Sequence, residues 1–127
     1  MRRSDQRREA VFALYQQRVT DRPLEELLKG AKPFTRELAE GAAEHADELD
    51  DEIARRARGW KLERIAPLEL SIMRVALHEM LHREDVPVEV AIDEAVNLAQ
   101  EFCGADAPDF VNGILGAVAR DLEAARR

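Results

Sequence analysis

The stretch "LELSIMRVALHEML", residues Leu68–Leu81, has apolar residues on nearly every side of the α-helix that its spacing predicts. Pro67 precedes it and suits the first turn of a helix, where a backbone N–H would have no partner within the helix. A surface helix shows an apolar stripe along one face, whereas a helix that is apolar on most sides is buried. This stretch therefore predicts the central helix of a helical bundle.

Amphipathic helical patterns surround this central helix in the sequence. Pro23 and Gly30 bracket a short helix, because proline favours helix starts and glycine favours helix ends. Apolar residues three or four apart between Phe34 and Trp60 predict one long helix, bent near Gly41. Further helices are predicted from Ser4 or Asp5 to Thr20, from the Asp85–Pro87 turn to Gly104, and from Pro108 onward. The sequence predicts one all-α domain, residues 1–127, of about six to seven helices.

Composition bounds the class of protein. The 127 residues are 46% hydrophobic, 35% charged and 5% aromatic, which is typical of a water-soluble helical domain. A single cysteine, Cys103, excludes an intramolecular disulfide and suits a reducing compartment. The N-terminus lacks the apolar run of a signal peptide, and no stretch reaches the length of a membrane span. We therefore expect a cytoplasmic protein with no membrane partner.

Charge is distributed unevenly over a chain whose net charge is −7. Four arginines, Arg2, Arg3, Arg7 and Arg8, lie within the first eight residues, whereas residues 44–52 contain six acids and no lysine or arginine. The arginines have two interpretations: a phosphate-binding edge, or the solvated start of a helix. The acidic segment similarly suits either a partner or solubility.

The sequence "HEMLH", from His78 to His82, matches the H-E-x-x-H pattern of zinc peptidases. Histidines at positions i and i+4 share one face of a helix and can both ligate zinc, with Glu79 as general base. A catalytic zinc site requires a third protein ligand and a cleft for substrate. The motif is therefore a hypothesis that the rest of the chain has to support.

That support is weak. Asp85 and Val88 occupy the positions where the extended motif has glycine and a third histidine. Spacing alone leaves Glu94 and Glu101 open as ligands, but no predicted strand is available to align a peptide substrate. His45 is expected at the edge of the core. We predict no catalytic residue, no metal and no cofactor.

Several motifs, in order, carry a resemblance to a known family. The segments "RREAVFALYQ", "IMRVALHEMLHREDVPVEVAIDEAVNLAQEF" and "FVNGIL" are similar to the first, central and closing parts of the NusB family of bacterial transcription antitermination factors. Residues from about 20 to 60 match only in their helical pattern. The resemblance implies two small three-helix bundles packed across each other.

The resemblance also implies a function and a set of partners. Members of this family pair with the small-subunit ribosomal protein NusE, bind single-stranded boxA RNA and support the elongation complex on ribosomal RNA operons. Arg2, Arg3, Arg7 and Arg8 then become candidates for binding RNA phosphates or stacking on bases. Ser4 and Asp5 interrupt the arginines and distinguish this chain from the family pattern.

The same resemblance points to a partner surface. Glu69, Asp106 and Phe110 match positions at or near the surface for NusE and RNA, where carboxylates suit a basic protein and an aromatic ring suits an anchor. Each also has a structural interpretation: the acids favour helix N-termini, and Phe110 suits a core. Trp60 could stack on RNA, but its place on the long apolar stripe favours packing in the core.

Three other interpretations compete with an RNA-binding antitermination factor. A helical adaptor of the same fold could act without RNA, and the zinc peptidase belongs to a different class. The NusB-like domain of ribosomal RNA methyltransferases is a third, for which we expect a further cofactor-binding domain. Monomer and homodimer both remain open.

Overall fold

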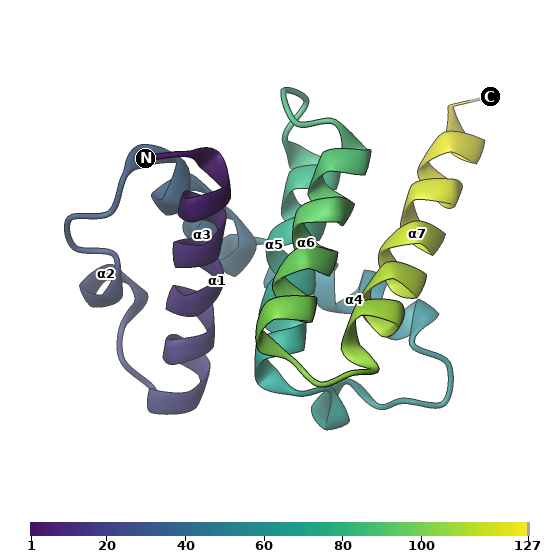
Figure 1. Ribbon diagram of the computed structural model, residues 1–127, viewed down its shortest axis with the longest axis horizontal. Helices are drawn as coiled ribbons and strands as arrows, with labels where there is room; N and C mark the ends of the chain where they lie inside the picture. The colour runs from purple at the N-terminus through teal and green to yellow at the C-terminus, as the bar shows by residue number, and fades with distance from the viewer. Residues whose placement is uncertain (127) are drawn as a thin grey trace.

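The computed structural model describes residues 1–126, and all of its regular elements are helical (Figure 1). Within this range the elements are α1 (Arg3–Thr20), α2 (Leu24–Leu27), α3 (Pro33–Glu44), α4 (Ala46–Arg56), the 3-10 turn η1 (Leu62–Arg64), α5 (Pro67–His82), α6 (Val88–Phe102) and α7 (Ala107–Ala125). The predicted all-α class is confirmed. Of these helices, none is both long and apolar enough to cross a membrane.

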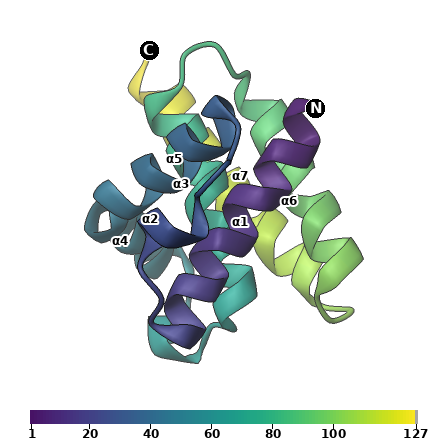
Figure 2. The same ribbon diagram turned by 90° about the vertical axis from the view of Figure 1, so that its left-hand side faces the viewer.

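The helices form two groups that meet at α5. Helices α1, α2 and α3 pack together on one side, and α4, α6 and α7 lie on the other (Figures 1 and 2). Helix α5 contacts α1, α3, α4, α6 and α7, and its Leu70, Met73 and Leu77 are fully buried. This central position explains why α5 is apolar on nearly every side, as the sequence predicted.

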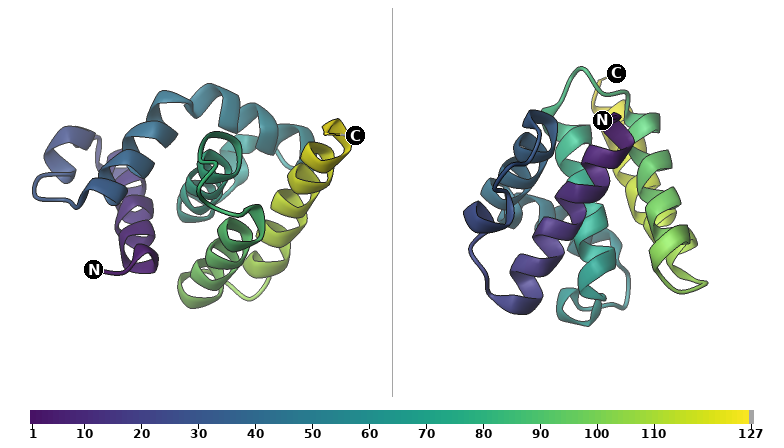
Figure 3. Two further views of the ribbon diagram at one scale, coloured as in Figure 1. Left: turned by 90° about the horizontal axis from the view of Figure 1, so that it is seen from above. Right: turned by 60° about the vertical axis from the view of Figure 1, so that its left-hand side comes forward.

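The predicted long helix between residues 33 and 60 is two helices. Helix α3 ends at Glu44 and α4 begins at Ala46, with a break at His45, four residues beyond the predicted bend at Gly41. The two follow an arc from one helix group to the other (Figure 3, left). Helix α4 ends at Arg56, and Gly59 has a φ of +78°, a left-handed conformation that favours glycine. Trp60 therefore lies in a connection and not on a helical stripe.

Gly41 permits a close approach between α3 and α5. A Cβ atom at position 41 would lie 2.2 Å from Cε1 of His78, which is far inside van der Waals contact. The His78 side chain is buried, so the ring has little room to move away. The role of Gly41 is thus to admit the His78 ring and not to bend the helix.

We predict that Gly41→Ala destabilises the protein by about 1–3 kcal/mol, because overpacking of the His78 ring outweighs the better helix propensity of alanine. Urea denaturation monitored by circular dichroism measures this change. Gly113→Ala is the matched control in α7, where an added Cβ meets nothing within 4 Å, and stability should rise by up to about 1 kcal/mol. A Gly41→Ala protein as stable as the parent would contradict the packing argument.

Candidate nucleic-acid interface

Arg7 faces the interior of the protein. Its side chain is 4% exposed, and its Nε donates a hydrogen bond to Oε1 of Glu79 at 2.8 Å, where the glutamate side chain is 1% exposed. A guanidinium in this position is not accessible to a phosphate group. The expectation that Arg7 binds RNA is therefore corrected: α1 buries this arginine against α5 to neutralise an interior carboxylate.

Two residues extend the Arg7–Glu79 pair to α6. Nη1 of Arg7 lies 3.4 Å from Oε1 of Glu94, and the Ser4 hydroxyl donates to the same oxygen at 2.6 Å. Burial raises the pKa of Glu79, and the neighbouring guanidinium counteracts that effect. In the sequence Ser4 interrupts the run of arginines. In the structure its hydroxyl helps to hold α1 on α6.

The other three N-terminal arginines lie at the surface. The side chains of Arg2, Arg3 and Arg8 are 85%, 49% and 43% exposed. Arg3 pairs with Asp85 at 3.0 Å, and Arg8 pairs with Glu101 at 2.9 Å. Exposed pairs of this kind contribute only about 0–1 kcal/mol, so a phosphate can exchange with either carboxylate. These guanidinium groups are available to an anionic ligand.

Phe102 accompanies the exposed arginines. The guanidinium of Arg8 lies 5.7 Å from the centroid of the Phe102 ring, which packs edge-on against Phe12. Phe102 is 40% exposed at the end of α6. Phe102 is not among the residues predicted from the sequence, although an aromatic at the C-terminal end of an amphipathic helix was the available signal. A cation beside an exposed ring suits single-stranded nucleic acid, whose bases stack on aromatics.

Glu69, Asp106 and Phe110 meet in one groove of about 300 Å³. Glu69 lies in the first turn of α5, Asp106 immediately precedes α7 without a side-chain capping hydrogen bond, and Phe110 lies in the first turn of α7. Burial raises the pKa of Glu69. Arg64 also lines the groove, so residues distant in the sequence form one aromatic surface with two acidic side chains and one basic side chain.

Trp60 forms part of the same groove. It is 56% exposed, and its ring centroid lies 6.0 Å from that of Phe110 in an edge-on arrangement. The prediction that Trp60 packs in the core was wrong, because α4 ends before it and the connection carries it outward. Both rings also line a second, larger groove with Arg55, Arg58 and Arg120.

The turn between α6 and α7 joins the arginine surface to the acidic groove. It runs from Phe102, beside Arg8, to Asp106 in the groove. Cys103 lies within this turn. Burial raises the pKa of the Cys103 thiol, and the nearby carboxylate of Glu69 raises it further. Arg8 and Phe102 are thus connected to the acidic groove by this short turn, whereas Arg3 pairs with Asp85 in the connection between α5 and α6.

The three polar residues of "HEMLH" are directed to different places. Glu79 is paired with Arg7 in the interior, and His78 packs against Gly41, where burial and the neighbouring imidazoles lower its pKa to about 4. Only His82 reaches the surface, 29% exposed. Because the glutamate that would act as general base is buried in an ion pair, the motif does not form a peptidase site.

Comparisons with known proteins identify relatives of this chain. The sequence profile of the NusB family matches residues 4–120. Transcription antitermination protein NusB of Bacillus subtilis is 39% identical over 97% of this chain and 98% of its own length. The NusB of Symbiobacterium thermophilum is 50% identical over 72% of this chain, and the match spans only 60% of that relative's length.

Solved structures share the fold. T. maritima NusB superposes with a TM-score of 0.88 at 32% identity, covering 94% of this chain and 92% of that chain. A chain in a crystal structure of the antitermination factors NusB and NusE in complex with double-stranded RNA superposes with a TM-score of 0.82. That chain is 22% identical, and the superposition covers 95% of this chain and 99% of that one.

We predict that Arg7→Met lowers the free energy of unfolding by about 3–5 kcal/mol, because it leaves the buried Glu79 carboxylate without its partner. Arg8→Met, which removes an exposed ion pair, should cost at most about 1 kcal/mol. Guanidinium denaturation compares the two variants. The double variant Arg7→Met/Glu79→Leu should recover most of the lost stability, and equal losses for Arg7→Met and Arg8→Met would contradict the assignment.

Proposed function

The chain belongs to the NusB family of transcription antitermination proteins, and from this premise we propose that it binds single-stranded boxA-type RNA jointly with the ribosomal protein NusE. The observation that carries the proposal is the continuous surface from Arg8 and Phe102 to the groove of Glu69, Asp106 and Phe110. One part suits RNA and the other suits a basic protein, so a single side of the molecule can serve both ligands.

The RNA site that we propose consists of Arg2, Arg3, Arg8 and Phe102. The arginines offer charge for phosphates, and the Phe102 ring offers a stacking surface for a base. Stacking on an exposed ring requires an unpaired base, which favours single-stranded over double-stranded RNA. Arg7 has no contact with RNA in this proposal and acts by orienting α1.

The partner site that we propose is the groove that contains Glu69, Asp106 and Phe110. Carboxylates attract a basic ribosomal protein, and half-buried Phe110 beside exposed Trp60 offers an aromatic anchor. A chain of net charge −7 repels RNA over much of its surface. A cationic partner in the groove would offset that repulsion next to the arginines, so RNA binding should be tighter in the heterodimer.

The cellular role follows from these two contacts. The structure of NusB and NusE with RNA supports the choice of partners, since it contains a chain of this fold. We infer that the heterodimer acts on the elongation complex during transcription of ribosomal RNA operons, in the cytoplasm where transcripts are made. A NusB-like adaptor that ignores RNA is the alternative outcome.

We predict that Arg3→Glu/Arg8→Glu weakens binding of a boxA RNA to the heterodimer with NusE by more than tenfold. Loss of two phosphate contacts should also reduce the slope of log affinity against log salt by about 1.4, at about 0.7 per contact with a single strand. Fluorescence anisotropy at several salt concentrations measures both quantities.

The control for this experiment is Arg18→Glu, with circular dichroism to verify helicity. It carries the same change of charge per site on an exposed position of α1, ten residues from Arg8 and so about 15 Å along the helix. We expect less than a twofold effect. If the parent heterodimer shows no RNA binding above background, the interpretation as an adaptor that ignores RNA replaces ours. If Arg3→Glu/Arg8→Glu and Arg18→Glu lose RNA affinity equally, the assigned RNA site is wrong.

A separate prediction concerns NusE. Phe110→Ala and Asp106→Lys should each weaken the heterodimer by at least about tenfold, because one removes an aromatic anchor and the other reverses a charge that faces a basic protein. Isothermal titration calorimetry with purified NusE measures the affinity. Asp93→Lys, on an exposed position of α6, is the matched control. Unchanged affinity in both groove variants would place the partner elsewhere.

A further inference from the structure

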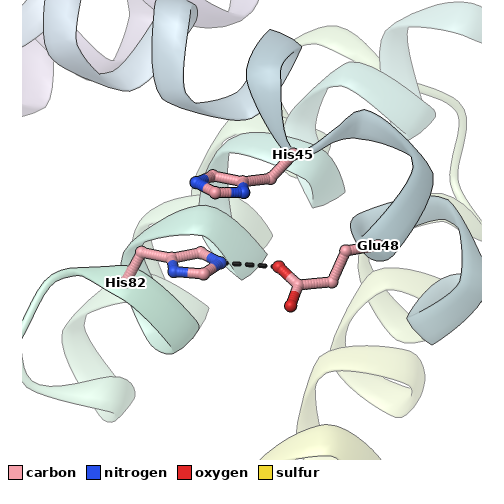
Figure 4. A group of neighbouring side chains, drawn as sticks. All are labelled: His45, Glu48 and His82. Atoms are coloured by element: carbon pink, nitrogen blue, oxygen red, sulfur yellow. Dashed lines mark hydrogen bonds and ion pairs between the residues drawn. The ribbon is translucent and has the colours of Figure 1, made fainter.

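A group of metal-binding side chains lies away from the proposed RNA and partner sites. His45 comes from the break between α3 and α4, Glu48 from the first turn of α4, and His82 from the last turn of α5 (Figure 4). One ligand atom from each residue lies within 4.8 Å of the other two. Two segments that are separate in the sequence, residues 45–48 and the end of α5, thus bring two imidazoles and a carboxylate together.

The donor groups of the three residues lie close together. Nε2 of His82 lies 2.6 Å from Oε1 of Glu48. The His45 ring stacks on the His82 ring with centroids 4.0 Å apart and an interplanar angle of 11°. In Figure 4 both rings have a nitrogen on the side where the Glu48 carboxylate lies. Because the lone pair of an imidazole nitrogen lies in the ring plane, coordination of one ion requires the two stacked rings to rotate out of their parallel arrangement, while the ligand atoms already lie within 4.8 Å of one another.

The break in the helix is what brings His45 to this position. Its φ and ψ of −97° and 18° interrupt the helix, while its N–H still donates to Gly41 and its carbonyl accepts from Leu49. The backbone is thus held on both sides of the break, which fixes the direction of the imidazole. His78 supports the group from the interior, with its ring centroid 5.8 Å from that of His45 and 5.5 Å from that of His82.

We propose that His45, Glu48 and His82 form a binding site for a divalent transition-metal ion of the Zn²⁺ class. Two imidazole nitrogens and one carboxylate oxygen are ligands that Zn²⁺ prefers, and water completes a tetrahedral shell. All three groups are at least partly exposed, so an ion can enter from solvent. The oxygen-preferring ions Mg²⁺ and Ca²⁺ are disfavoured by the two nitrogens.

This site differs from the one that the peptidase motif suggested. It uses only His82 of "HEMLH", and Glu79 is engaged with Arg7. In this proposal the role of the ion is structural: it cross-links the α3–α4 break to the end of α5. Because that break lies where the chain passes from one helix group to the other, a bound ion stabilises the junction between them (Figure 3).

Calorimetric titration of ZnCl₂ into the chelator-treated full chain, without a polyhistidine tag, tests the proposal. We expect one saturable site per chain for Zn²⁺ and no saturable heat for MgCl₂. Loss of a residue that merely orients a ligand costs about 10–100-fold in metal affinity. We therefore expect His45→Ala and His82→Ala to weaken binding by about 100-fold or more, and Glu48→Gln by about tenfold or more.

The matched control is Glu44→Gln, which removes the same charge from an exposed residue next to His45 that is not one of the three ligands. It should change the affinity less than twofold. Saturating Zn²⁺ should also raise the melting temperature of the parent but not of His82→Ala, because ligand binding to the folded state adds stability. Circular dichroism verifies that each variant is folded.

Three results would overturn the proposal. One is the absence of saturable Zn²⁺ binding to the parent chain. Another is parental affinity in both His45→Ala and His82→Ala, which would assign the ion to other residues. The third is an equal loss in Glu44→Gln and Glu48→Gln, which would indicate general attraction to the acidic segment, residues 44–52, and not coordination by Glu48.

Discussion

The buried ion pair between Arg7 and Glu79 is the interaction on which the rest of the arrangement depends. Two buried charges are tolerated only where they are paired and hydrogen-bonded to each other. The Arg7–Glu79 pair therefore restricts α1 to the position against α5 in which these two side chains meet. Glu94 and Ser4 extend the same restriction to α6. Because α5 also contacts α3, α4 and α7, the pair connects the first helix to the centre of the whole molecule.

This interior pair also determines the outer surface. Once the guanidinium of Arg7 points inward, the adjacent Arg8 is turned toward the edge of the α1 interface, while Arg3, one turn earlier on the same face, is exposed at the start of the helix. Arg8 then lies beside Phe102, from which a short turn leads to Asp106 and the acidic groove. The proposed RNA and partner sites are thus neighbours because one buried contact sets the rotation of α1.

The "HEMLH" stretch illustrates how little a helical motif determines without its surroundings. His78 fills the space beside Gly41, Glu79 neutralises Arg7, and His82 stacks on His45 at the surface. The motif assumes that both histidines face one open cleft, but α1 and α3 cover two of the three residues. The proposed metal site therefore draws its other ligands from α4 and the break before it.

The sequence by itself determined the all-α class, the central position of α5 and the boundaries of most helices, because apolar periodicity and proline positions are local properties. The resemblance to family motifs also singled out Glu69, Asp106 and Phe110, and these three residues line one groove. Only the tertiary structure decided that Arg7 is buried while Arg3 and Arg8 are exposed, that Trp60 faces solvent, and that His45 meets His82. Periodicity describes one helix at a time, whereas burial and side-chain pairing depend on which other helix lies opposite.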